Sequence, residues 1–207
     1  GTEFLDLISP QYVSDLVCWG AIGARTAESQ VHRELTSGLS CPMGIKNSTK
    51  GDVQIAIDAI KSAQYQHVFL GTTKKGKVAI FKTSGNDDTH IILRGGLEPN
   101  YHPKDIENCR AGLEKNEVNA NIMVDFSHGN SQKNHENQKK VSASICDQIA
   151  NGNKDIIGVM IESHLKEGNQ KISEDMEYGK SITDACVNWE ETKKLLNDLA
   201  QAVKARR

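Results

Sequence analysis

Short apolar runs, each ending in polar or charged residues, alternate with helical patterns along most of the chain. The clearest run, Ile122-Met-Val-Asp-Phe126, passes directly into the polar cluster Ser127-His-Gly-Asn130. A second run, Ile156-Ile-Gly-Val-Met-Ile161, passes into Glu162-Ser-His164. Runs of this length are typical of buried strands, and ligands gather where the strands of a parallel sheet end. The two runs therefore predict two strands whose metal-capable ends share one site.

The same alternation predicts further elements on both sides of these strands. Apolar residues spaced three and four apart indicate helices, and short apolar runs between them indicate strands. Strands are expected at 2–6, 16–23, 41–45 and 90–93, and helices at 26–38, 53–60, 103–116, 132–151 and 188–207, with Ser9 capping a short helix at Pro10. The rhythm breaks twice. Segments 66–72 and 77–83 flank Lys74-Lys-Gly76 and predict a β-hairpin, whereas 165–180 is a polar loop without apolar periodicity.

Strands that alternate with helices indicate a parallel α/β sheet whose two faces are both covered. Polar side chains stand at the carboxyl ends of the predicted strands: Arg25, Lys46, Arg94, His128 and Glu162. Functional groups at that one rim are the signature of a (β/α)8 TIM barrel, which usually takes ~250 residues. Five such strands and the short strand at Glu3 are too few, so we expect an incomplete barrel, about strands 3–8.

Composition and charge narrow the class of protein. The chain has 207 residues, a net charge of −2 and a hydrophobic fraction of 37%. No global basic field favours nucleic acid, and no run approaches the ~18 apolar residues of a membrane span. The five cysteines show no CxxC spacing, which favours reduced thiols in a cytoplasmic protein over a disulfide framework. We therefore expect no nucleic-acid partner, no membrane and no signal peptide.

Three cations lie at the predicted rim: Arg25, Lys46 and Arg94. Guanidinium groups bind phosphate oxygens in pairs, while the lysine ammonium acts as a point charge. Hydrogen bonds to charged groups contribute ~1.5–3 kcal/mol each, so three converging cations would bind a small phosphorylated anion. Each of them, taken alone, is as readily explained as a solvated loop residue.

The second set at the rim consists of His128, Glu162 and a later carboxylate, for which Asp184 is the candidate. One imidazole and two carboxylates suit a borderline divalent ion such as Mn²⁺, Fe²⁺, Co²⁺ or Zn²⁺. His164 competes with Glu162, because residues two apart on an extended chain face the same side. A lone histidine is more often a hydrogen-bonded strand-end residue than a ligand.

Several long motifs resemble type I 3-deoxy-D-arabino-heptulosonate-7-phosphate (DAHP) synthases, and they occur in that family's order. They are Gly20-Ala-Ile-Gly-Ala-Arg-Thr26, Ser37-Gly-Leu-Ser-Cys-Pro42, Ile92-Leu-Arg-Gly-Gly96 with Ile91 before it, Asp125-Phe-Ser-His128, Gly158-Val-Met-Ile-Glu-Ser-His164 and Gly179-Lys-Ser-Ile-Thr-Asp-Ala-Cys186. The resemblance runs from Gly1 to Arg207. It implies a catalytic barrel domain over 1–207 that lacks its N-terminal part and carries an inserted regulatory hairpin at 66–83.

The resemblance also implies an activity: condensation of phosphoenolpyruvate with erythrose 4-phosphate, the first step of the shikimate pathway, by a metal-dependent transferase. His128, Glu162 and Asp184 match the family's metal ligands. Arg25, Lys46 and Arg94 match contacts to phosphoenolpyruvate, and Glu3 matches an acidic residue near its carboxylate. Catalytic roles are implied for Arg25, Lys46 and His128. The family forms dimers and tetramers, so we expect a homo-oligomer.

Two family features have no counterpart among these residues. None of the five cysteines matches the family's fourth metal ligand, a cysteine on the first barrel strand, and the Lys-Pro-Arg-Thr motif for erythrose 4-phosphate is absent. We therefore expect the chain to be the C-terminal part of such an enzyme, lacking the first two strands and most of the third, and to be inactive alone. The alternatives are a different phosphate-binding metal aldolase, or a non-catalytic assembly or amino-acid-binding subunit.

Family members are inhibited by an aromatic amino acid in a pocket near the hairpin. By resemblance Gln11, Ser40, Phe69 and Gly71 fall in that pocket. The position of Gly71 resembles the one where serine accompanies phenylalanine sensitivity and glycine accompanies tyrosine sensitivity. Because glycine leaves room for a phenolic hydroxyl, tyrosine is the expected inhibitor. Gly71 is otherwise explained as a strand irregularity.

Overall fold

A computed structural model describes all 207 residues of the chain and divides them into two compact units. Unit 1 comprises residues 1–92 and 111–121, and unit 2 comprises residues 93–110 and 122–207. One boundary between the units falls within helix α4 (Pro103–Lys115). The helix belongs to unit 2 up to residue 110 and to unit 1 from residue 111.

Unit 1 contains four parallel strands that neighbour one another in the order β1, β2, β3, β6. Their bounds are β1 (Thr2–Glu3), β2 (Gly20–Ile22), β3 (Met43–Lys46) and β6 (Thr89–Leu93), whose last residue lies at the unit boundary. The register places Ile22 beside Ile45 and Lys46 beside Ile92. Strands β2, β3 and β6 are buried along their whole length, as expected for parallel strands covered on both faces.

The helices of unit 1 are α1 (Pro10–Val13), α2 (Gln30–Ser37) and α3 (Gln54–Ala63), with a short 3-10 turn at Ser14–Leu16. Helix α3 buries Ile57 and Ile60, as its spacing predicts. One apolar core joins the first strands to the segment around α2: Phe4, Ile22, Leu35, Leu39, Cys41 and Met43. The core packs against β2 and β3, and Arg25 follows the first of these strands while Lys46 ends the second.

Two boundaries and one capping bond expected from the sequence are wrong in unit 1, although α1 begins at Pro10 as predicted. The helix expected from Thr26 begins at Gln30, because Gly23 to Ser29 forms consecutive turns in which Thr26 and Ser29 donate to carbonyls three residues back. The strand expected from residue 16 begins at Gly20. Ser9 does not cap α1 with its own side chain; its N–H and hydroxyl bond the Asp6 carboxylate instead.

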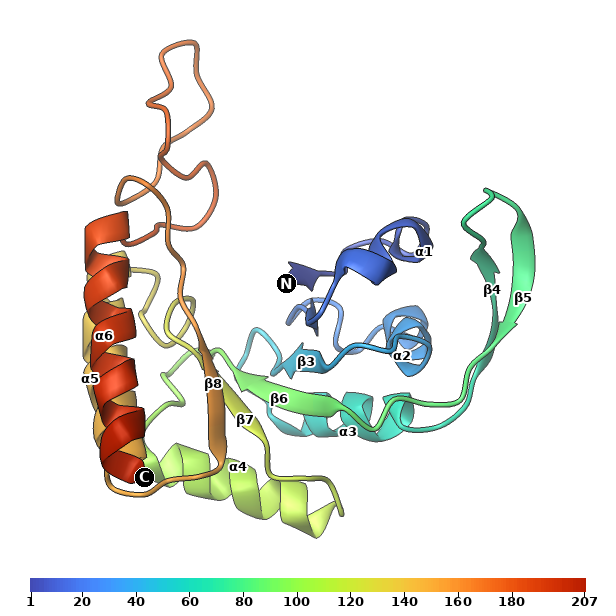
Figure 1. The fold of residues 1–207 in the computed structure, drawn as a ribbon, viewed down its shortest axis with the longest axis horizontal. Coiled ribbons are helices and arrows are strands. Elements are labelled where there is room, and N and C mark those ends of the chain that lie inside the picture. Colours follow the sequence, from blue (N-terminus) through green and yellow to red (C-terminus); the bar gives the residue numbers. More distant parts are fainter. The chain divides into compact units, whose positions relative to one another are not determined.

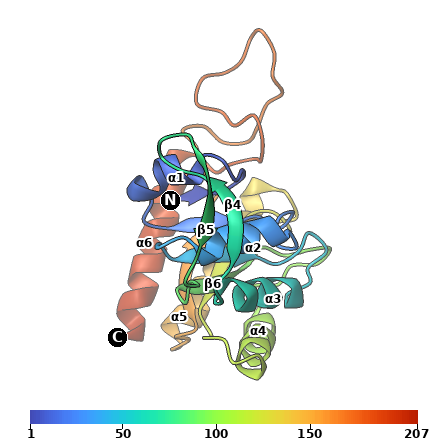
Figure 2. The same ribbon diagram turned by 90° about the vertical axis from the view of Figure 1, so that its right-hand side faces the viewer.

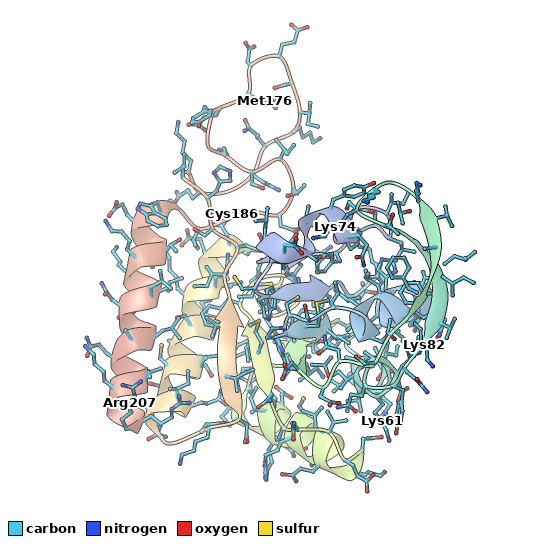
Figure 3. The ribbon with its side chains drawn as sticks, turned by 45° about the vertical axis from the view of Figure 1, so that its right-hand side comes forward. Lys61, Lys74, Lys82, Met176, Cys186 and Arg207 are labelled. Atoms are coloured by element: carbon cyan, nitrogen blue, oxygen red, sulfur yellow. The ribbon has the colours of Figure 1, made fainter.

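The predicted hairpin is present in unit 1 as β4 (Val68–Thr72) and β5 (Val78–Lys82), which pair antiparallel (Figure 2). Phe69 lies opposite Phe81, and their rings stack with centroids 5.9 Å apart. The hairpin tip contacts the α1 segment, where Lys74 forms an ion pair with Asp15. Figure 3 labels Lys74 near the tip and Lys82 toward the base of the ribbon.

Unit 2 contains the parallel pair β7 (Ile122–Asp125) and β8 (Ile156–Met160), with helices α5 (Gln138–Ala150) and α6 (Trp189–Arg206). The two helices lie side by side (Figure 1). Helix α5 buries Val141, Ile145 and Ile149, which confirms the four-residue spacing seen in the sequence. Asn188 caps α6, as predicted, by accepting the N–H of Glu191 at 2.9 Å.

Helix α5 begins six residues later than the sequence suggested. Gln132 and Lys133 have φ angles of 54° and 59°, in the left-handed region that an α-helix of L-residues does not use. A 3-10 turn at His135–Asn137 then leads into the helix. The intervening turns keep residues 127–134 as a compact loop at the end of β7.

The polar loop predicted at 165–180 extends from the end of β8, with Met176 at its far end (Figure 3). It is held by its own hydrogen bonds. Lys166 donates its N–H to Gly179, and the Gln170 side chain bonds backbone groups of Glu177 and Lys180. The loop therefore leads back in a defined path to Asp184.

Two chain-wide findings bear on the sequence expectations. All five cysteines are free thiols, and Cys18 alone of them is exposed. Burial raises the pKa of the Cys109 thiol to about 12, so it stays protonated and unreactive. Among the helices, none combines the length and the apolar character that crossing a bilayer requires.

Candidate metal and anion site

His128 stands in a sharp turn immediately after β7. Its φ angle is 53°, in the left-handed region that residues with a side chain seldom adopt. Asp125, the last residue of β7, begins the turn by accepting the Ser127 N–H at 2.9 Å. The turn points the imidazole away from the strand direction and toward the ends of β8 and the long loop.

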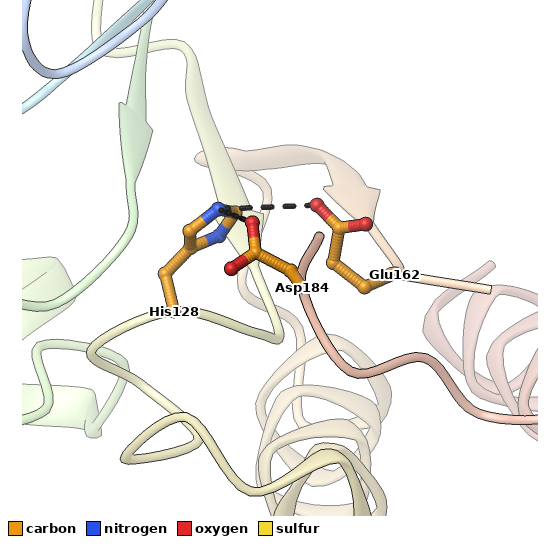
Figure 4. A group of neighbouring side chains, drawn as sticks. All are labelled: His128, Glu162 and Asp184. Carbon is orange, nitrogen blue, oxygen red and sulfur yellow. Dashed lines mark ion pairs between the residues drawn. The ribbon is translucent and has the colours of Figure 1, made fainter. Parts of the chain in front are cut away.

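The structure brings together the three side chains expected to bind a metal, His128, Glu162 and Asp184 (Figure 4). His128 Nε2 lies 3.4 Å from an Asp184 carboxylate oxygen and 3.8 Å from one of Glu162. Donor atoms around a tetrahedral ion with ~2.1 Å bonds are separated by ~3.4 Å. One imidazole nitrogen and two carboxylate oxygens at these distances fit a borderline divalent ion.

The backbone of Glu162 is held by the side chain of Gln138, a residue that the sequence did not single out. Gln138 is completely buried at the start of α5. Its side-chain amide donates to the carbonyl of Glu162 and accepts the N–H of Glu162, both at 3.0 Å. This pair of hydrogen bonds fixes the backbone at position 162, and the carboxylate faces His128.

Asp184 is positioned by the closing end of the long loop. Two residues after it, Cys186 exchanges two backbone hydrogen bonds with Gly168, and Val187 donates to the carbonyl of Glu162 at 2.9 Å. Asp184 is the most exposed of the three, with 58% of its side chain accessible. Burial and the nearby Glu162 charge raise the pKa of the Cys186 thiol.

His164, the alternative to Glu162, faces elsewhere. It is exposed, and its Nδ1 accepts the N–H of Leu165 at 2.8 Å. The geometry at β8 therefore favours Glu162 as the residue that faces His128.

Arg94 is tied to the His128 turn through backbone and amide groups of unit 2. Its carbonyl accepts the N–H of Gly129 at 2.9 Å. Asn130, which is 3% exposed, donates its side-chain amide to the carbonyls of Leu93 and Asp125 and accepts the N–H of Asn100. The ends of β6 and β7 are therefore joined by one buried amide.

Glycine is required where these two turns meet. A Cβ at Gly129 would lie 2.6 Å from the backbone nitrogen of Gly96, and one at Gly95 would lie 2.4 Å from that of Asn130. Backbone cannot move aside as a flexible side chain can, so Gly95 and Gly129 permit an approach that no other residue allows. The Arg94 turn and the His128 turn consequently form one packed body.

The remaining anion-binding candidates belong to unit 1. Lys46 is the last residue of β3 and only 6% exposed, Arg25 is exposed in the turns after β2, and Glu3 ends β1. The Glu3 carboxylate lies directly against Gly23, where a Cβ would overlap it. Arg94, 9% exposed, belongs to unit 2.

A cavity of about 200 Å³ lies between the hairpin, α1 and α2 in unit 1. Gln11 and Phe69, both expected near an inhibitor site, line it together with Leu35, Gly38, Phe81, Lys82, Thr83 and Ser84. Ser40 lines an adjoining hollow of about 310 Å³ that shares Gly38 and Ser84. Phe81 and Thr83 were not foreseen, because an alternating hairpin strand gives no sign of which face covers a cavity.

Gly71 lies beneath one of these rings. A Cβ at Gly71 would lie 2.8 Å from the Phe81 ring. The space that glycine leaves is therefore space that the Phe81 ring uses. A larger residue at this position would have to displace that ring toward the cavity or away from it.

A sequence comparison identifies the family to which the chain belongs. Residues 1–197 match the DAHP synthetase I family, and the chain belongs to that family. The match confirms the resemblance noted in the motifs. The fold expectation, an incomplete (β/α)8 barrel with an inserted hairpin, is also confirmed by the structural comparison.

Similar proteins share the chain's whole length but are longer themselves. The chain is 60% identical to the Phe-sensitive phospho-2-dehydro-3-deoxyheptonate aldolase of Escherichia coli K12, covering 99% of the chain and 59% of the relative. The Trp-sensitive enzyme of that strain is 52% identical, with 60% of it covered. The chain thus spans about three-fifths of the length of these relatives.

A solved structure matches just as extensively. The phospho-2-dehydro-3-deoxyheptonate aldolase of Francisella tularensis SCHU S4 superposes with a TM-score of 0.96 at 56% identity. The superposition covers 99% of the chain and 60% of that protein.

Proposed function

We propose that this chain supplies the metal-binding and phosphate-binding part of a DAHP synthase, which condenses phosphoenolpyruvate with erythrose 4-phosphate and releases phosphate. The observation that carries the proposal is the convergence of His128, Glu162 and Asp184 on one point in a chain of this family. We further propose that residues 1–207 belong to a single catalytic domain, and that the protein is a cytoplasmic homo-oligomer.

His128, Glu162 and Asp184 would hold a divalent ion of the Mn²⁺, Fe²⁺, Co²⁺ or Zn²⁺ type. The bound ion would supply Lewis acidity that polarises the aldehyde carbonyl of erythrose 4-phosphate. The two carboxylates offset the charge of the ion, and the imidazole of His128 contributes a neutral donor. The exposed edge at Asp184 leaves one side of the group accessible to substrate.

Arg25, Lys46 and Arg94 would bind phosphoenolpyruvate, with Glu3 near its carboxylate. Two of the three cations, Lys46 and Arg94, are buried at or next to strand ends. In such surroundings their charge is screened less by water, so it would stabilise the negative charge that develops as phosphate departs. Arg94 would have its turn held in place by the Asn130 amide.

The test is turnover by the full-length protein that contains this chain. With both substrates and Mn²⁺, we expect release of inorganic phosphate together with DAHP. Replacing His128 with alanine should lower metal-dependent kcat by roughly 10²–10⁴-fold, because Lewis-acid stabilisation contributes several kcal/mol. Near-normal turnover with stoichiometric metal in His128→Ala would remove His128 from the ligand set. His164→Ala is the matched control and should retain activity.

Regulation by an aromatic amino acid is a second part of the proposal, with tyrosine as the inhibitor. The relatives carry the names Phe-sensitive and Trp-sensitive, so the choice rests on Gly71. Its missing side chain lets the Phe81 ring lie over the strand, which would leave the cavity lined by Gln11 and Phe69 longer.

Replacing Gly71 with serine tests this assignment. The new side chain would press on Phe81, so we expect tyrosine inhibition to weaken roughly 3–10-fold, about the value of one hydrogen bond. Inhibition constants for tyrosine, phenylalanine and tryptophan on both proteins provide the measurement. Inhibition of the unaltered protein by phenylalanine and not by tyrosine would overturn the assignment.

A further inference from the structure

Asp125 is a completely buried carboxylate beside the metal-capable group, and nothing in the proposed function uses it. Its side chain has 0% exposure. One oxygen, Oδ1, accepts the Ser127 N–H at 2.9 Å. The other, Oδ2, lies 2.7 Å from Nδ1 of His128. The two side chains are thus in direct contact on the ring edge opposite the metal site.

A bare nitrogen and a carboxylate oxygen this close would repel each other through their lone pairs, so the contact favours the imidazole tautomer with its hydrogen on Nδ1. With Nδ1 carrying hydrogen, the neutral ring has its lone pair on Nε2. That is the atom that lies 3.4 Å from Asp184 and 3.8 Å from Glu162.

We propose that Asp125 is the positioning residue that makes His128 a ligand: it holds the proton on Nδ1 and directs the bare Nε2 toward Glu162 and Asp184. The inference rests on the metal site of the proposed function. Metal-binding histidines commonly donate their second N–H to a carboxylate, which fixes the tautomer and the ring orientation.

The local backbone explains why such a residue is needed. His128 has a left-handed φ of 53° and follows the end of β7, so no strand geometry sets the direction of its side chain. Asp125 itself is the last residue of β7, and its carbonyl accepts the Asn130 amide at 2.8 Å. A carboxylate anchored in the sheet therefore orients a ring carried by a turn.

Asp125→Asn separates this role from simple packing. Asparagine has nearly the same shape, but its amide can donate to Nδ1 and so favour the tautomer with hydrogen on Nε2. In that tautomer Nε2 has no lone pair to offer to a metal facing Glu162 and Asp184. An analogous tautomer change accounts for the large effect of replacing the aspartate of serine-protease triads. Gln148→Ala is the control. Gln148 lies on α5 of the same unit, and its replacement removes buried hydrogen bonds to the Tyr101 carbonyl and to Ser144 without touching the metal-capable group.

The experiment measures Mn²⁺ affinity calorimetrically on the full-length protein without substrates, together with thermal unfolding. We expect Asp125→Asn to weaken Mn²⁺ binding ~10–100-fold, the usual effect of losing such a partner, and Gln148→Ala to change stability but not Mn²⁺ affinity. Raising the Mn²⁺ concentration should restore much of the turnover of Asp125→Asn and none of that of His128→Ala.

A second readout uses the unaltered protein with diamagnetic Zn²⁺. Nitrogen NMR of the His128 ring should show a protonated Nδ1 that exchanges slowly with solvent and a bare, metal-shifted Nε2. A ring bound through Nδ1, or Mn²⁺ affinity unchanged in Asp125→Asn, would overturn the role of Asp125 alone. Failure of the unaltered protein to bind Mn²⁺ or Zn²⁺ would instead overturn the proposed metal site, and the positioning role with it.

Discussion

The metal-capable region of unit 2 and the hairpin cavity of unit 1 are built in opposite ways. Around His128 the side chains are polar, and buried amides such as Asn130 and Gln138 bond several backbone segments at once. Beside the hairpin the lining combines the stacked Phe69 and Phe81 rings with polar side chains such as Gln11. Its cross-links are few, chiefly the Thr83 hydroxyl with Ser37 and His67.

The difference follows from what each region would have to hold. An ion needs its donors within a few tenths of an ångström, and interlocking polar groups provide that precision because any shift leaves one of them unsatisfied. A pocket for the side chain of an amino acid needs volume, which apolar rings supply with small rearrangements. A two-stranded ribbon is also marginally stable by itself, which suits an element that responds to a ligand.

The largest effect is expected when the polar network is opened at Asn130. Asn130→Ala leaves the carbonyls of Leu93 and Asp125 and the N–H of Asn100 without the buried amide. At ~1–3 kcal/mol for each buried group left unsatisfied, we expect the free energy of unfolding in urea to fall by ~3 kcal/mol or more. Because the Arg94 turn would loosen too, Mn²⁺ affinity and the KM for phosphoenolpyruvate should both worsen.

The matched change beside the hairpin is Thr83→Val, which removes the hydroxyl that accepts the His67 N–H at 2.8 Å and bonds Ser37. Its expected cost is ~1 kcal/mol, with Mn²⁺ affinity unchanged. Equal losses of stability in the two variants would mean that the two regions are cross-linked to the same degree, and the contrast between them would not hold.

A somewhat smaller and pH-dependent effect is expected at His90, a buried histidine in β6 of unit 1. Unlike His128 it has no carboxylate beside it in the described contacts; Trp19 donates its indole N–H to Nε2 at 3.2 Å. Burial lowers the pKa of His90 to about 4 from 6.5. The unfolded chain therefore binds the proton more readily, and stability is full above pH 6.5 and lost as pH falls toward 4.

That pKa difference lowers the free energy of unfolding by ~3 kcal/mol at pH 4 relative to pH 7. The measurement is urea unfolding of the unaltered protein and of His90→Phe at several pH values from 7 to 4. The difference between the two should change by that amount across the range, because acidic residues common to both cancel. Parallel pH profiles would show that His90 is solvated in the native protein and that its strand is less dry than the structure indicates.

The sequence predicted the elements of both regions but not how they are fixed. Short apolar runs located β7 and β8, two segments flanking a Lys-Lys-Gly turn located the hairpin, and family motifs pointed to His128, Glu162 and Asp184. The spacing could not reveal that Gln138 clamps Glu162, because a glutamine at a helix start is ordinary and its partner is 24 residues away in the chain. The same holds for Phe81, whose role depends on a ring lying over Gly71.

Boundaries failed where local hydrogen bonding replaced the expected element. Gly23 to Ser29 forms turns instead of the first helical turn, and left-handed residues at 132–133 delay α5. Apolar periodicity does not register such turns, since it reads side chains and not backbone angles. The residue types at the strand ends were thus predictable, whereas their precise positions depended on turns that no pattern marks.

The smallest effect is expected on the outward face of the hairpin. Val68, Leu70, Val78 and Ile80 are each more than 60% exposed, and Leu70 lies opposite Ile80 across the two strands. Ile80→Thr keeps the β-branched shape that strands favour and removes apolar surface that water already reaches. We expect the free energy of unfolding to change by no more than ~0.5 kcal/mol, as for most surface substitutions.

The measurement for Ile80→Thr is urea unfolding at two protein concentrations, with Ala79→Thr on the opposite face of the same strand as the control. Ala79 is less exposed and lies opposite Gly71, so its replacement should cost more. A loss well above 1 kcal/mol at Ile80 that grows on dilution would show that another chain covers this face in solution. The hairpin would then be stabilised by contacts with another chain, whereas the network around His128 is stabilised by contacts within its own unit.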